Sequence, residues 1–140
     1  MSTSPAPSLI ESLDLQPHPE GGWYRQTWAA AETVTLPDGR VRPTATLIYF
    51  LLPAGESSAW HRVASDELWL AHRGTVALEL GGVGEGPVLE TTVVVDLEQP
   101  QALVPAGTWQ RTAPAAADAL LSCLVSPGFD FDDFELAPRG

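Results

Sequence analysis

The stretch SAWHRVASDELWLAHRG, residues Ser58–Gly74, contains the spacing that decides the fold. Five residues separate Gly55 from His61, three separate Val63 from Glu67, and six separate Glu67 from the glycine that closes the stretch. An imidazole and a carboxylate at this spacing are half of a metal-binding pattern. A second histidine would complete the pair at position 63, where this chain has valine.

Strand geometry predicts which of these side chains share a face. Residues two apart in a β-strand point the same way, so His61 is expected to point with Val63, and Glu67 with Trp69. His72 is at an odd spacing from Glu67 and should point to the opposite face. It therefore cannot replace the missing ligand unless a bulge redirects it.

The composition favours one domain built from many short strands. The chain has 140 residues, 44% of them hydrophobic, with 13 prolines and 12 glycines spread along it. One helix is expected at Ser8–Leu15, with Ser8 as its N-cap and Glu11 completing a capping box. Strands are expected at Gly22–Ala30, Thr44–Pro53, Ala59–Val63, Glu67–His72, Thr75–Leu80, Val88–Val95, Gln101–Val104, Thr108–Thr112 and Leu120–Val125. Turn residues between such short segments predict a sandwich or a barrel.

Two further segments have a recognisable pattern. LPDGR, residues 36–40, is typical of a turn with Asp-Gly at its centre. The tail from Phe129 to Phe134 alternates aromatic and acidic residues, which suits either an edge strand or a segment wrapped over another surface.

Charge excludes several classes of partner. The net charge is −11, with 7 Lys+Arg against 18 Asp+Glu, so binding to nucleic acid or to an anionic membrane is not expected. Cys123 is the single cysteine, which rules out an intrachain disulfide. The N-terminal residues have no basic region followed by an apolar run, as a signal peptide requires. These features predict a cytoplasmic protein.

A second pattern lies in VPAGTWQ, residues Val104–Gln110. Together the two patterns resemble the two cupin motifs, with Val63 and Gln110 in place of histidines. With HPEGGWYRQT near the start and PGFDFDDFEL near the end, the chain is similar to the small single-domain "cupin five" family, whose function is unknown.

The resemblance implies an all-β cupin jelly roll, commonly dimeric, with a pocket inside the barrel. The domain is expected to span residues 8–136, with flexible ends at 1–7 and 137–140. The resemblance also implies that His61, Glu67 and Gln110 point into the barrel.

These residues are open to a metal interpretation and to an acid–base interpretation. One imidazole, one carboxylate and one neutral amide (His61, Glu67 and Gln110) form a poor metal anchor, so either no metal or a weakly bound divalent ion is expected. Alternatively, His61 titrates near neutrality and Glu67 orients it. Such a pair can abstract a proton next to a carbonyl, as an epimerase or isomerase requires, with Tyr49 or Tyr24 as the opposing acid.

Other side chains are candidates for ligand binding. Arg25 and Arg62 can hold an anionic group, and Trp60, Trp69 and Trp109 can stack on a sugar ring. For each tryptophan taken alone, packing in the core or at a dimer interface is the favoured explanation. The segment containing His18 and Glu20 is expected to shape a turn, with a lid over the pocket as the alternative.

Two functions follow from these residues. In the first, the protein is an isomerase or epimerase for a small polar or sugar-like substrate, with His61 as base, Glu67 as its partner, and Gln110 and Arg62 binding the substrate. In the second, it is a binding module in which the same side chains only hold a small molecule. A metal-dependent enzyme is a third, weaker hypothesis.

Overall fold

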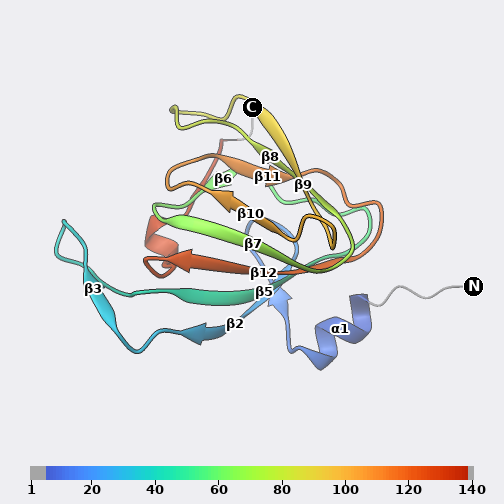
Figure 1. Ribbon diagram of the computed structural model, residues 1–140, viewed down its shortest axis with the longest axis horizontal. Helices are drawn as coiled ribbons and strands as arrows, with labels where there is room; N and C mark the ends of the chain where they lie inside the picture. The colour runs from blue at the N-terminus through green and yellow to red at the C-terminus, as the bar shows by residue number, and fades with distance from the viewer. Residues whose placement is uncertain (1–5, 139–140) are drawn as a thin grey trace, which may run out of the picture.

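Antiparallel sheets and one short helix make up the computed structural model, which describes residues 6–138 (Figure 1). The first sheet has the order β1-β2-β5-β12-β7-β10 and the second has the order β13-β6-β11-β8-β9. The strands of the first sheet are β1 (Gln16–Pro17), β2 (Trp23–Ala29), β5 (Thr46–Leu52), β12 (Ala119–Ser126), β7 (Asp66–Arg73) and β10 (Gln101–Val104). Those of the second are β13 (Glu135–Leu136), β6 (His61–Arg62), β11 (Gln110–Thr112), β8 (Val76–Leu80) and β9 (Thr91–Val95). Strands β3 (Thr33–Thr35) and β4 (Val41–Pro43) form a separate hairpin.

The main core lies between the two sheets. It is formed by buried side chains of both, including Phe50 and Trp69 from the first sheet and Leu78 and Val95 from the second. Alternation explains this arrangement, since in β10 the four residues are exposed, buried, exposed and buried in turn. The result is the jelly-roll barrel that the sequence predicts.

A second, smaller cluster lies under helix α1 (Ala6–Ser12). Leu15 and Leu51 are buried there, with Leu9 and Leu13 packed against them. The predicted N-cap was wrong, because the helix begins at Ala6 and Ser8 lies inside it. The helix also ends before Leu15, at a turn in which Asp14 has a φ of 54°.

All nine predicted strands are present, with ends shifted by up to three residues. The turn predicted at residues 36–40 joins β3 to β4, with Gly39 at a φ of 91°. His72 is exposed, on the face opposite to buried Glu67 and Trp69, as the spacing predicts. No helix among residues 6–138 has the length and apolar character needed to cross a membrane.

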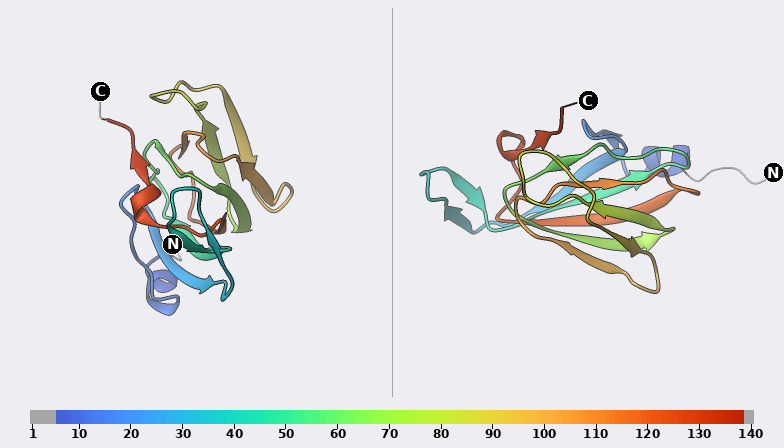
Figure 2. Two further views of the ribbon diagram at one scale, coloured as in Figure 1. Left: turned by 90° about the vertical axis from the view of Figure 1, so that its left-hand side faces the viewer. Right: turned by 90° about the horizontal axis from the view of Figure 1, so that it is seen from above.

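The structure defines the segments that precede β2 and follow β12. Strand β1 leads into β2, and the tail forms a short 3-10 helix, η1 (Phe131–Asp133), followed by β13, which pairs with β6. Part of each predicted flexible end is ordered. Ala6 and Pro7 belong to α1, and the backbone N–H of Ala137 donates to the Trp60 carbonyl. Residues 1–5 and 139–140 lie outside the described residues. Figure 2 shows that the segment after β1 and the C-terminal segment lie on the same side of the barrel, where they enclose the site described next.

Candidate functional site

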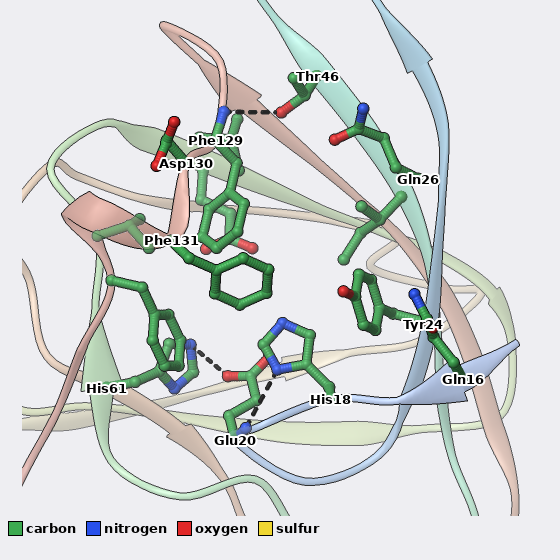
Figure 3. Close-up of a pocket in the computed structure, with 15 residues that line it drawn as sticks. Gln16, His18, Glu20, Tyr24, Gln26, Thr46, His61, Phe129, Asp130 and Phe131 are labelled. Atoms are coloured by element: carbon green, nitrogen blue, oxygen red, sulfur yellow. Dashed lines mark hydrogen bonds and ion pairs between the residues drawn. The ribbon is translucent and has the colours of Figure 1, made fainter.

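A cavity of about 420 Å³ opens at the side of the barrel where the segment around β1 faces the C-terminal segment (Figure 3). Its walls come from β1 and the segment after it, from strands β2, β5, β6, β7 and β12, and from the C-terminal segment. The lining residues are Gln16, His18, Glu20, Tyr24, Gln26, Thr46, Ile48, His61, Val63, Glu67, Val125, Phe129, Asp130, Phe131 and Phe134. Two of the candidates from the sequence motif, His61 and Glu67, therefore lie in one cavity.

His61 forms an ion pair with a carboxylate that the sequence motif does not contain. Its Nε2 lies 2.5 Å from Oε2 of Glu20, and its Nδ1–H donates to the Ala59 carbonyl at 2.8 Å. Burial by itself lowers the pKa of His61, but the charge and hydrogen bond of Glu20, helped by Glu67, outweigh it and raise that pKa to about 9. The ring is therefore an imidazolium at neutral pH, with both nitrogens donating.

His18 fixes the other side of Glu20. Its Nδ1 accepts the Glu20 backbone N–H at 3.1 Å and lies 3.6 Å from Glu20 Oε1. Burial lowers the pKa of His18 more than Glu20 raises it. A ring nitrogen that accepts a backbone N–H has no proton, so His18 is neutral with its proton on Nε2.

The local backbone places Glu20 in this position. Gly21 and Gly22 have φ values of 108° and 77°, a region that other residues rarely adopt. A Cβ on Gly22 would lie 2.6 Å from the Phe50 ring. The two glycines thus let the chain turn tightly against the barrel and bring Glu20 to His61.

Glu67 is part of a buried hydrogen-bond chain. Trp69 Nε1–H donates to Gln110 Oε1 at 2.9 Å, and Gln110 Nε2–H donates to Glu67 Oε1 at 2.8 Å. Because the indole N–H can only donate, it fixes the orientation of the Gln110 amide. Burial raises the pKa of Glu67 to about 7, against the lowering effects of His61, Gln110 and the Cys123 thiol. Glu67 therefore changes its protonation state near neutral pH.

The metal interpretation does not fit these contacts. Gln110 turns its amide nitrogen, not its oxygen, toward Glu67, and its oxygen is used by Trp69. The Nε2 of His61 is used by Glu20. Among residues 6–138 no group of three or more His, Cys, Asp or Glu side chains is arranged to hold a metal ion, so no chemical step is assigned to a metal here.

The arginines expected to bind an anionic ligand lie outside the cavity lining. Arg62 forms an ion pair with Glu135 and lies over the Trp109 ring at 4.4 Å. Arg25 donates to the carbonyl of Leu13 beside the helix.

Three aromatic candidates also lie elsewhere. Trp60 is covered by the Arg111 guanidinium, 4.5 Å from its ring, and Tyr49 packs against His72. Trp69 is buried in the core and contacts the site only through Gln110.

Sequence reasoning missed Glu20 as the partner of His61. It left open the alternative that His18 and Glu20 close the pocket. Both residues line the cavity, which favours that alternative. The signal was present in PHPEGG, residues 17–22, where an imidazole and a carboxylate precede two glycines. The aromatic wall from Phe129 to Phe134 was read only as an edge or a wrap, and its contact with the cavity depends on long-range packing.

The comparisons with known proteins agree with this architecture. A hypothetical protein from Leishmania major is 33% identical, with a TM-score of 0.80 over 95% of this chain and 86% of that one. A protein from Shewanella oneidensis is 36% identical, with a TM-score of 0.78 over 97% of this chain and 85% of that one. The capsular polysaccharide assembling protein CapF from Staphylococcus aureus shares the fold alone, at 12% identity and a TM-score of 0.66 over 89% of this chain and 34% of that one.

No curated protein matches the sequence. Residues 7–137 match the family described as "Cupin superfamily (DUF985)", which covers nearly all of the jelly roll and both sides of the cavity. The chain therefore belongs to this cupin family.

Proposed function

We propose that the cavity is the active site of an isomerase or epimerase that moves a proton on a carbon next to a carbonyl group of a small polar substrate. The observation that supports this most is that the cavity lining holds two ionisable groups in different environments. One is the His61–Glu20 ion pair, and the other is Glu67 at the end of its own hydrogen-bond chain. Groups whose environments separate their pKa values are suited to different roles, here a fixed positive charge and a base.

The roles differ from those expected from the sequence. Glu20 takes the Nε2–H of His61 and the Ala59 carbonyl takes its Nδ1–H, so His61 acts as a fixed positive charge beside the carbonyl oxygen of the substrate. Glu67, with a pKa of about 7, takes the proton from the neighbouring carbon. The electron pair of the broken C–H bond then forms the enolate, whose oxygen is stabilised by the imidazolium. For an isomerisation, Glu67 returns the proton to the former carbonyl carbon while the neighbouring hydroxyl passes its proton to the enolate oxygen. For an epimerisation, the proton returns to the opposite face of the carbon that it left.

A binding module without turnover is the second candidate function. It is favoured by the aromatic wall, in which Tyr24, Phe129, Phe131 and Phe134 give the cavity large apolar surfaces. Such surfaces hold a small molecule without any chemistry. The two functions differ in whether a carbon-bound proton is exchanged.

The test is a deuterium-exchange screen. Small hydroxy-aldehydes, hydroxy-ketones and sugars are incubated with the protein in D₂O, and loss of the proton next to the carbonyl is followed by ¹H NMR. We expect exchange with the native protein, no detectable exchange with Glu67→Gln, and a loss of at least about 100-fold with His61→Asn. Arg62→Gln is the matched control because Arg62 lies outside the cavity. Equal exchange by Glu67→Gln would refute the catalytic roles, and binding without exchange would favour the binding module.

A further inference from the structure

The charged side chains of the cavity lining are mostly acidic. Three carboxylates, Glu20, Glu67 and Asp130, line it, and within the described chain no lysine or arginine does. Glu20 is neutralised by His61, yet its buried Oε2 receives no further hydrogen bond from residues 6–138. His61 is the one cationic side chain of the lining within residues 6–138, so carboxylates outnumber cations there by three to one. Asp130 also forms an ion pair with Arg42 Nη1, at 3.6 Å, and Arg42 lies outside the lining.

The aromatic rings of the lining stand at steep angles to one another. The centroid of Phe131 lies 4.8 Å from Phe129, 5.8 Å from Phe134 and 6.5 Å from Tyr24, with interplanar angles between 73° and 82°. Figure 3 shows Phe131 pointing toward the middle of the cavity, between Phe129 and the side carrying His18 and Tyr24. These edge-to-face pairs line one side of the cavity with aromatic surface from Tyr24, Phe129, Phe131 and Phe134. Phe131 is also 46% exposed, so its ring is open to an incoming ligand.

From these two observations we infer that the cavity takes a small organic cation, with a protonated amine or a quaternary ammonium group against the rings and with Glu67 and Asp130 as its counter-charges. The inference deepens the proposed function and rests on it for the reaction, because it names the substrate as an amine that also carries a hydroxyl or carbonyl group. That oxygen would face the His61 ring, which lines the same cavity.

The physical basis is the field inside the cavity. The negative faces of aromatic rings attract a cation, more strongly where water is excluded. The carboxylates of the lining outnumber its one imidazolium, and this excess adds to the attraction in a medium of low dielectric constant. The same groups repel phosphorylated or carboxylated compounds, and the two arginines that would have offset this repulsion, Arg25 and Arg62, lie outside the lining.

The test uses three ligands of nearly equal shape and different charge. Choline is the cation, 3,3-dimethylbutan-1-ol its neutral counterpart, and 3,3-dimethylbutanoate the anion. Binding to the full chain is measured by isothermal titration calorimetry and by saturation-transfer NMR. We expect choline to bind about tenfold more tightly than the alcohol, and the anion not to bind. The inference is overturned if the alcohol binds as tightly as choline, if the anion binds best, or if none of the three binds up to its solubility limit.

Variants test the assignment of the groups. Phe131→Leu and Asp130→Asn should each reduce the preference for choline over the alcohol by at least about threefold. Asparagine can still accept the Asp132 N–H that Asp130 accepts at the start of η1, so that helix is retained. Trp28→Leu is the control, since Trp28 is 50% exposed and outside the lining. An undiminished preference in both cavity variants overturns the site.

The two proposals fail separately. Preference for choline without any proton exchange leaves the ligand class standing and refutes the catalytic roles. Proton exchange on neutral sugars, with no preference for choline, supports the catalytic roles and refutes the ligand class.

Discussion

Replacing Glu20 by glutamine removes a charge but retains the shape of the side chain. Glu20 Oε2 lies 2.5 Å from His61 Nε2, and the pair is almost fully buried. Without the carboxylate, burial becomes the dominant influence on His61 and lowers its pKa, opposed only by Glu67 and the Ala59 carbonyl. We therefore expect the pKa of His61 to fall from about 9 by more than about one pH unit in Glu20→Gln.

The same ion pair sets how stability depends on pH. A histidine whose pKa rises on folding stabilises the folded state fully below its unfolded pKa of 6.5, and this stabilisation is lost as the pH rises through about 9. At about 1.4 kcal/mol for each pH unit, the difference corresponds to on the order of 3 kcal/mol. The native protein should therefore exceed Glu20→Gln in stability most clearly at or below pH 6.5, and the difference should shrink above about pH 9.

Two measurements check this prediction. Long-range ¹H–¹⁵N correlation spectra titrate the imidazole of His61 directly, and urea unfolding at several pH values gives the free energy of unfolding. Glu135→Gln is the control, because Glu135 is an exposed carboxylate paired with Arg62 outside the cavity. The reasoning is refuted if the pKa of His61 stays near 9 in Glu20→Gln, or if the stability difference grows as the pH rises.

Three further substitutions have defined outcomes. Glu67→Gln should make the protein more stable than the native form above pH 7, by on the order of 3 kcal/mol. Because the pKa of Glu67 is raised on folding, the native protein loses stability as the pH rises from 4.5 to about 7. The amide of glutamine does not ionise, so the variant does not have this loss. Urea unfolding at pH 5 and pH 8 checks this, and a variant less stable at pH 8 contradicts it. Gly22→Ala should cost at least about 2 kcal/mol, because its φ is 77° and a Cβ would lie 2.6 Å from Phe50; an unchanged melting temperature would show that the turn can relax. Trp69→Phe should cost about 2 kcal/mol or more, since the fully buried oxygen of Gln110 loses its donor, and a loss below about 0.5 kcal/mol in chemical denaturation would mean that another group replaces the indole N–H.

Local pattern was enough to predict the short strands of a sandwich or barrel, and the resemblance to cupins favoured the barrel. The alternation in Gln101–Val104, which is β10, and the apolar run of β5 need no knowledge of distant residues, because strand period and turn residues are local properties. The motif spacing likewise indicated that His61 and Glu67 belong to one pocket, and both line the cavity.

The partner of His61 could not be obtained in the same way. Glu20 is 41 positions earlier in the chain and reaches His61 only because Gly21 and Gly22 adopt positive φ values against the folded barrel. The tail posed the same problem. Its alternation suited either an edge strand or a segment wrapped over another surface. Asp133 pairs with Arg40 and Arg42 of a distant hairpin, and those ion pairs hold the aromatic residues at the cavity. Long-range contacts of this kind have no signature in a single sequence.

One wall of the cavity, residues 129–134, is held by the Asp133 ion pairs and by the pairing of β13 with β6, and it contributes no residue to the core between the two sheets. Such a segment can open locally at a lower free energy than the barrel itself. Loss of the cavity wall and unfolding of the barrel are therefore separable events, and a protein with a melted tail can keep an intact core.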